Sequence, residues 1–122
     1  MTNRSVASAL FFLCTLGVAG QASAHAHLKT SLPADKSTVT SSPPAVTMTF
    51  TESLNLKFSG IKVIGPEKVA VKTGDASLSD EDKGLIVPVA GPLAAGSYTV
   101  EWHVLSSDGH KTSGSFGFTV KP

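Results

Sequence analysis

The sequence predicts an all-β domain, a Greek-key sandwich or barrel of seven strands, for three reasons. Helical periodicity is nearly absent after residue 24. Short runs rich in Val, Thr, Ile and Phe alternate apolar with polar residues, as half-buried strands do. These runs end at clusters of Pro, Gly, Ser or Asp, which form turns. Seven strands in about 100 residues are typical of sandwiches. The expected strands are 26–31, 45–51, 59–64, 69–73, 85–89, 97–105 and 114–121.

Three of these strands have an alternation clear enough to assign a core-facing side. The core residues predicted in this way are Val46, Met48, Phe50, Tyr98, Val100, Trp102, Val104, Phe116, Phe118 and Val120. Each large apolar side chain contributes roughly 1.5–3 kcal/mol on burial, so this core can stabilise a domain that has no disulfide bonds. Tyr98 follows "LAAGS" at the start of a strand, which also predicts a tyrosine corner.

The first 24 residues are predicted to be a secretory signal peptide. Arg4 supplies a positive start, and residues 6–19 form an apolar stretch that is too short to span a bilayer comfortably. "ASA" at 22–24 matches the small-x-small pattern of a cleavage site. We therefore expect a leader at 1–24, one domain at 25–122, and no insertion of the cleaved domain into a membrane.

Composition excludes several kinds of function. The only cysteine, Cys14, lies in the leader, so the cleaved domain has no disulfide and no thiolate site. Ten basic and nine acidic residues are interspersed, which gives no patch for nucleic acid or an anionic membrane surface. We expect a monomeric domain.

Cleavage after Ala24 would make His25 the first residue of the mature chain. Its free amine and its own imidazole Nδ1 could then close a six-membered chelate ring on one metal ion. The alternative is that cleavage simply leaves a frayed, solvated histidine.

A second candidate chelate lies in "SSDGHK" at 106–111. Asp108 and His110 are two residues apart, so their side chains point to the same side of an extended backbone. The alternative is an ordinary Asp-Gly turn between the last two strands. Together with a His25 terminus, the donors would be an amine, two imidazoles and a carboxylate. This set suits tetragonal Cu(II), or Ni(II), better than Cu(I), since Met48 is expected in the core.

Three other polar residues have weaker assignments. His27 could wrap a metal through the backbone nitrogens behind the amine, or lie nearby as a second imidazole, and a strand at 26–31 would oppose the wrap. Glu52, at a strand end in "FTES", is either an acidic site residue or a solvated turn carboxylate. His103 is expected to be exposed on the polar face.

The segments "HAHLKTSLPA", "FTESL" and "GSYTVEWHVLSSDGHKTSGSFGFTV" resemble the CopC family of periplasmic copper-binding proteins, in its short, methionine-poor, YobA-like branch. The resemblance covers essentially all of 25–122. It implies a cupredoxin-like, immunoglobulin-like sandwich that holds Cu(II) through the amine and imidazole of His25 with Asp108 and His110. Glu52 matches an acidic position that lies near the metal, without binding it, in some members. Family members are often encoded near, or fused to, a CopD-like inner-membrane protein thought to import copper.

The resulting hypothesis is a periplasmic Cu(II)-binding protein of copper homeostasis or resistance. It would sequester or deliver copper through an N-terminal histidine brace, without catalysis. One alternative is a copper-dependent oxidative enzyme resembling a lytic polysaccharide monooxygenase, although Asp108 would fill the position that oxygen needs. The other is a metal-free immunoglobulin-like interaction module, which would not explain a histidine at the cleavage point together with D-G-H.

Overall fold

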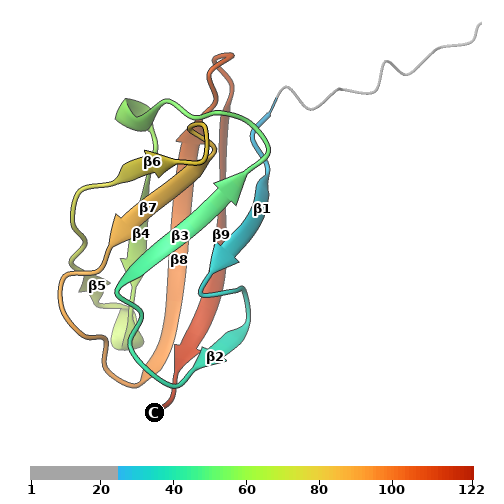
Figure 1. Ribbon diagram of the computed structural model, residues 1–122. Coiled ribbons are helices and arrows are strands. Elements are labelled where there is room, and N and C mark those ends of the chain that lie inside the picture. The colour runs from blue at the N-terminus through green and yellow to red at the C-terminus, as the bar shows by residue number, and fades with distance from the viewer. Residues whose placement is uncertain (1–24) are drawn as a thin grey trace, which may run out of the picture.

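The computed structural model describes residues 25–122, which form two β-sheets packed face to face (Figure 1). The predicted signal peptide, 1–24, lies outside the described residues. One sheet has the strand order β1-β3-β7-β6 and the other β2-β9-β8-β4-β5. The strands are β1 (Leu28–Leu32), β2 (Ser37–Val39), β3 (Ala45–Phe50), β4 (Gly60–Ile64), β5 (Ala70–Val71), β6 (Ser77–Ser79), β7 (Gly84–Pro88), β8 (Gly96–Leu105) and β9 (Lys111–Val120). Two short 3-10 helices, η1 (Leu56–Phe58) and η2 (Pro66–Lys68), complete the elements.

The hydrophobic core lies between the sheets and confirms the predicted alternation. All ten residues assigned to the core are buried, none of them more than 9% exposed. The rings of Phe50 and Trp102 meet edge to face across the two sheets, with centroids 5.2 Å apart. The structure therefore confirms the predicted fold class, an all-β sandwich.

The described residues contain nine strands rather than the predicted seven. The two additional strands, β2 and β6, have three residues each, too few for an alternation to be recognised. β2 also pairs in parallel with the end of β9, a partner some 80 residues away in the sequence that no local pattern reveals.

The last strand begins earlier than predicted, at Lys111 instead of residue 114. β8 and β9 pair without interruption from Gly96↔Val120 to Leu105↔Lys111. This long hairpin places the loop 106–110 beyond the edge of the core, at the end of the sandwich opposite the C-terminus (Figure 1).

The predicted tyrosine corner is present at the other end of the sandwich. The Tyr98 hydroxyl donates a hydrogen bond to the Ala94 carbonyl at 2.6 Å, and the ring stacks on Phe118. Gly96 precedes it with a φ of 143°, and a Cβ there would collide with Pro66, so glycine is required. Within residues 25–122, no helix is long and apolar enough to cross a membrane.

Candidate metal centre

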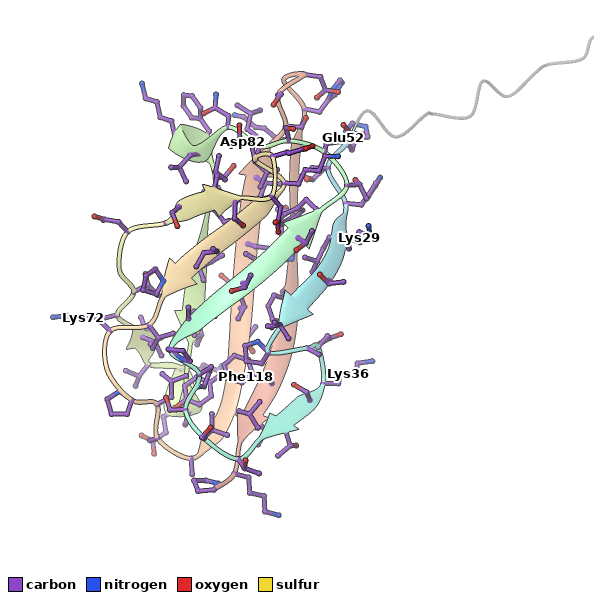
Figure 2. The ribbon with its side chains drawn as sticks, in the orientation of Figure 1. Lys29, Lys36, Glu52, Lys72, Asp82 and Phe118 are labelled. Atoms are coloured by element: carbon purple, nitrogen blue, oxygen red, sulfur yellow. The ribbon has the colours of Figure 1, made fainter. Side chains whose placement is uncertain are left out.

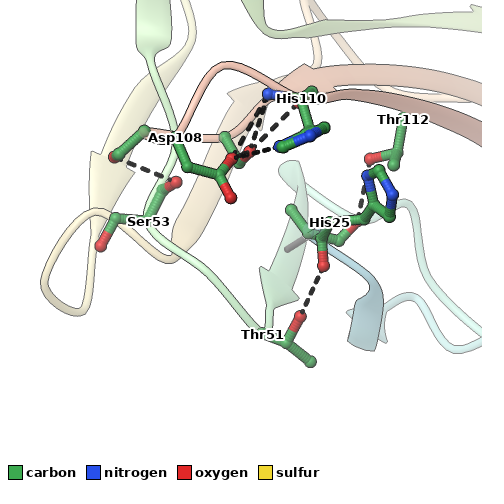
Figure 3. Close-up of polar contacts among 9 residues, drawn as sticks. His25, Thr51, Ser53, Asp108, His110 and Thr112 are labelled. Carbon is green, nitrogen blue, oxygen red and sulfur yellow. Dashed lines mark hydrogen bonds and ion pairs between the residues drawn. The ribbon is translucent and has the colours of Figure 1, made fainter. Parts of the chain in front are cut away.

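The start of the domain is fixed to the sandwich by two threonines. The Ala26 side chain is fully buried, and its carbonyl accepts a hydrogen bond from Thr112 Oγ1 at 2.8 Å. The amide of His27 donates to Thr51 Oγ1 at 2.9 Å, and the amide of Thr51 donates to the His27 carbonyl at 3.0 Å. Thr51 Oγ1 also donates to the His25 carbonyl at 3.5 Å (Figure 3). Residues 25–27 are therefore held at one end of the sandwich.

The D-G-H run forms the tight loop of the β8–β9 hairpin. The amide of Ser106 donates to the His110 carbonyl, and the amide of Gly109 donates to the Ser106 carbonyl, both at 2.9 Å. Gly109 has a φ of 91°, a conformation that favours glycine. The turn proposed as the alternative interpretation of this run is thus present, and it brings Asp108 and His110 to the same side.

Asp108 is tied to its own loop by hydrogen bonds to one carboxylate oxygen. Oδ1 lies 3.1 Å from His110 Nδ1, accepts from the His110 amide at 3.3 Å, and accepts from the Ser106 hydroxyl. Two hydrogen bonds lower the pKa of Asp108 below its ordinary value of 3.8: the one from the Ser106 hydroxyl has the larger effect, and the one from the His110 side chain has the next largest. Asp108 is therefore an ionised carboxylate at neutral pH, and its side chain is about half exposed to solvent.

The start of the domain and the β8–β9 loop meet at His25 and His110. Their ring centroids are 4.7 Å apart and the rings are nearly perpendicular, at 85° (Figure 3). Nδ1 of His25 is buried and has no hydrogen-bond partner in the described part of the chain. A buried nitrogen without a partner is costly unless a ligand satisfies it. This is the nitrogen that a chelate with the amine of residue 25 requires.

The donor set is not closed into a finished metal cage. Among residues 25–122, no group of three His, Cys, Asp or Glu side chains is already arranged to hold a metal ion. The two imidazoles are together, but the carboxylate of Asp108 faces Ser106 and His110 within its own loop. A bound ion would have to draw this carboxylate in.

The weaker candidates lie around this pair without joining it. His27 is exposed, with its ring centroid 6.4 Å from that of His25. Glu52 is half-buried at the same end as Asp82 (Figure 2), in the segment that follows Thr51. No polar contact of its side chain occurs within the described residues. His103 is exposed on β8, as predicted, and lies outside this cluster.

Three residues that position the candidate ligands were not predicted from the sequence: Thr51, Ser106 and Thr112. Ser106 is almost fully buried, and its hydroxyl bridges Asp108 and the His110 backbone. Its place after Trp102 and Val104 continues the core-facing alternation, so a serine there could have been noticed. The two threonines act across 24 and 86 residues of sequence, and no local signal marks them.

A β-sandwich that gathers two imidazoles and a carboxylate beside the start of its domain has the features of a small metal-binding module. The chain belongs to the CopC family, because the model of the CopC domain matches residues 28–121. Protein YobA of Escherichia coli K12 is 46% identical over 121 residues, 98% of each chain. This similarity agrees with the branch indicated by the sequence.

Solved structures show the same relationship. The chain is similar to PcoC from Escherichia coli, described as a methionine-rich copper resistance protein, with a TM-score of 0.73 and 34% identity. The match covers 80% of this chain and all of PcoC. CopC from Methylosinus trichosporium OB3b matches with a TM-score of 0.72 and 34% identity, over 80% of this chain and 95% of that one. The fold is therefore the cupredoxin-like sandwich of these proteins.

Proposed function

We propose that this protein binds Cu(II) in the periplasm and serves copper homeostasis or resistance by sequestering or delivering the ion. The observation that carries the proposal is the pairing of His25 and His110, 4.7 Å apart, with His25 Nδ1 buried and without a partner. Two imidazoles bound at about 2.0 Å on adjacent corners of a square have centroids roughly 4.5 Å apart. The observed separation is compatible with that arrangement.

Each ligand has a distinct role in the proposed centre. His25 contributes Nδ1 and, once the leader is cleaved after Ala24, its amine. His110 contributes Nε2, because its Nδ1 faces Asp108. Asp108 orients the His110 ring in the metal-free protein and, once drawn out of that contact, contributes a carboxylate oxygen. His27 and Glu52 are proposed to lie near the ion without binding it.

The preference for Cu(II) over Cu(I) follows from the absence of sulfur donors. Soft thiolate and thioether ligands select Cu(I), whereas nitrogen and oxygen donors suit Cu(II). The described residues contain no cysteine, and their one methionine, Met48, is fully buried in the core. PcoC, by contrast, is described as methionine rich.

In the proposed function copper is cargo, and the protein carries out no catalytic step on it. The similar proteins are described as copper resistance proteins, a description that supports carriage or sequestration. We further propose that the protein acts as a monomer and that it delivers copper to a CopD-like inner-membrane protein. Rapid ascorbate-driven peroxide formation by the copper-loaded protein would contradict it and favour an oxidative enzyme.

The test is a Cu(II) titration at pH 7 of mature protein that begins at His25. Quenching of Trp102 emission should saturate at one copper per chain. His110→Ala should bind far more weakly, whereas His103→Ala, which removes an exposed histidine outside the cluster, should bind as wild type does. Electron paramagnetic resonance would count the nitrogen donors. Unsaturable binding, or equal affinity in both variants, would refute the proposed site.

A further inference from the structure

The first three residues of the mature chain, His-Ala-His, offer Cu(II) two mutually exclusive binding modes. In the first, the amine and His25 Nδ1 form the chelate of the proposed centre. In the second, the peptide wraps the ion in a plane with the amine, the amide nitrogens of Ala26 and His27, and the imidazole of His27. The wrap displaces the two amide protons to solvent, whereas the first mode leaves both amides protonated.

The structure withholds the His27 amide from such a wrap. Its N–H donates to Thr51 Oγ1 at 2.9 Å, and the His27 carbonyl accepts from the Thr51 amide at 3.0 Å. Thr51 Oγ1 also donates to the His25 carbonyl at 3.5 Å. One side chain thus engages the backbone on both sides of Ala26. The wrap would have to break these bonds before the His27 nitrogen could lose its proton.

Ala26 is held from the other sheet as well. Its methyl group is fully buried, and Thr112 Oγ1 on β9 donates to its carbonyl at 2.8 Å. Curling residues 25–27 into a plane around an ion would extract this side chain from the core. The His25 ring, by contrast, already lies against His110. The packing therefore opposes one mode and is compatible with the other.

We propose that Thr51 is a positioning residue whose hydroxyl selects the His25 chelate and excludes the three-residue wrap. This inference rests on the proposed function. Because the all-nitrogen planar wrap also suits Ni(II), the same hydroxyl discriminates against Ni(II) at the terminus. Thr51 is exposed, so its effect on metal binding can be separated from core stability.

The experiment compares wild type, Thr51→Val and Thr51→Ser, all in mature protein that begins at His25. One net hydrogen bond changes a population about fivefold, so Thr51→Val should raise the proportion of wrapped Cu(II), and the Ni(II) affinity, by about that factor. Thr51→Ser keeps the hydroxyl and should behave as wild type. The wrap is counted by titrating the two additional protons released per metal and by the four-nitrogen hyperfine pattern.

Two controls isolate the mechanism. In metal-free protein, the His27 amide should exchange with solvent faster in Thr51→Val than in wild type or Thr51→Ser. In the Thr51→Val background, His27→Ala should abolish the gain in Ni(II) affinity, because the wrap loses its imidazole. Should the valine variant not fold, Thr51→Ala serves in its place.

The outcomes separate this inference from the proposed function. If wild type releases both amide protons on binding Cu(II), or if Thr51→Val leaves proton release and Ni(II) affinity unchanged, the role of Thr51 is refuted while copper binding stands. If Thr51→Ser behaves like Thr51→Val, the hydroxyl is not the selecting group and the inference also fails. If wild type shows no saturable Cu(II) binding, the proposed function itself fails.

Discussion

The two ends of this sandwich differ in one buried polar atom each, the Tyr98 hydroxyl at one end and His25 Nδ1 at the other. At the end of the tyrosine corner, the Tyr98 hydroxyl is satisfied by the Ala94 carbonyl, and its ring stacks on Phe118 with centroids 5.3 Å apart. At the other end, His25 Nδ1 is buried without a partner in the described part of the chain. A satisfied group stabilises the fold, whereas an unsatisfied one carries a cost that a ligand can remove.

This difference indicates a division between stability and binding along the long axis of the molecule. Changes at the corner should alter the free energy of unfolding and leave metal affinity alone. Changes to the candidate ligands themselves should do the reverse. Variants at both ends can therefore test the separation.

The largest expected effect is on stability at the corner. Phe118→Ala removes a buried ring that stacks on Tyr98, and such truncations cost about 3–5 kcal/mol of unfolding free energy. Urea denaturation of the mature protein measures it. Phe58→Ala, at an exposed ring, is the control and should stay within about 0.5 kcal/mol of wild type. A loss of Cu(II) affinity in the folded Phe118→Ala protein would break the proposed division.

The next effect is on binding at the other end. A methionine left ahead of His25 converts the amine into a peptide nitrogen and should weaken Cu(II) binding by about 100-fold or more, since even outer partners of a metal are worth 10–100-fold. Competition with a chelator of known affinity measures the change. The metal-free extended protein should unfold at the same urea concentration as the unextended one. Equal affinity would show that the amine is not a ligand.

A smaller effect is expected for the corner hydroxyl. Tyr98→Phe deletes the bond to Ala94 and keeps the stacked ring, so it should cost about 1 kcal/mol of unfolding free energy. Denaturant midpoints at equal m-value measure the loss. Cu(II) affinity should match wild type, and a change in the number of nitrogen donors would contradict the comparison.

The smallest effect concerns the charge state of the loop. Ser106→Ala removes the main cause of the lowered pKa of Asp108, so this pKa should rise towards 3.8. A lowered carboxyl pKa adds stability that is present above pH 3.8 and is lost as the pH falls through the folded-state value. The variant should therefore lose part of this pH dependence. Carboxyl carbon shifts during an acid titration measure the pKa, and an unchanged value would exclude the hydroxyl as its cause.

The core could be predicted from sequence because strand alternation is a local property. Val100, Trp102 and Val104 alternate with polar neighbours, and burial follows directly. β2 could not be predicted, since three residues carry no period and its partner is the distant end of β9. Strand pairing between segments far apart is decided by the whole topology.

The candidate centre was predicted as residue types and not as geometry. His25, Asp108 and His110 could be nominated by chemistry, but their proximity depends on how β1 and the β8–β9 hairpin meet in space. The hydroxyls of Thr51 and Thr112 act only because the fold brings them to residues 25–27. Ser106 is intermediate, since its parity was visible in the sequence and its bridging role was not.

Burial of Ala26 has a consequence for maturation. Its methyl group lies wholly in the core, only one residue from the nitrogen that leader cleavage would release. Only a few rotatable bonds lie between that nitrogen and the buried Ala26 side chain, so binding an ion would cost little conformational entropy. Under the proposed function, cleavage of the leader one peptide bond away from Ala24 would still give a folded protein, but its amine would no longer lie where it can bind the ion together with His25 Nδ1. Export and accurate cleavage of the leader would then be required for copper binding. The precursor would not bind copper at this site until it had crossed the inner membrane.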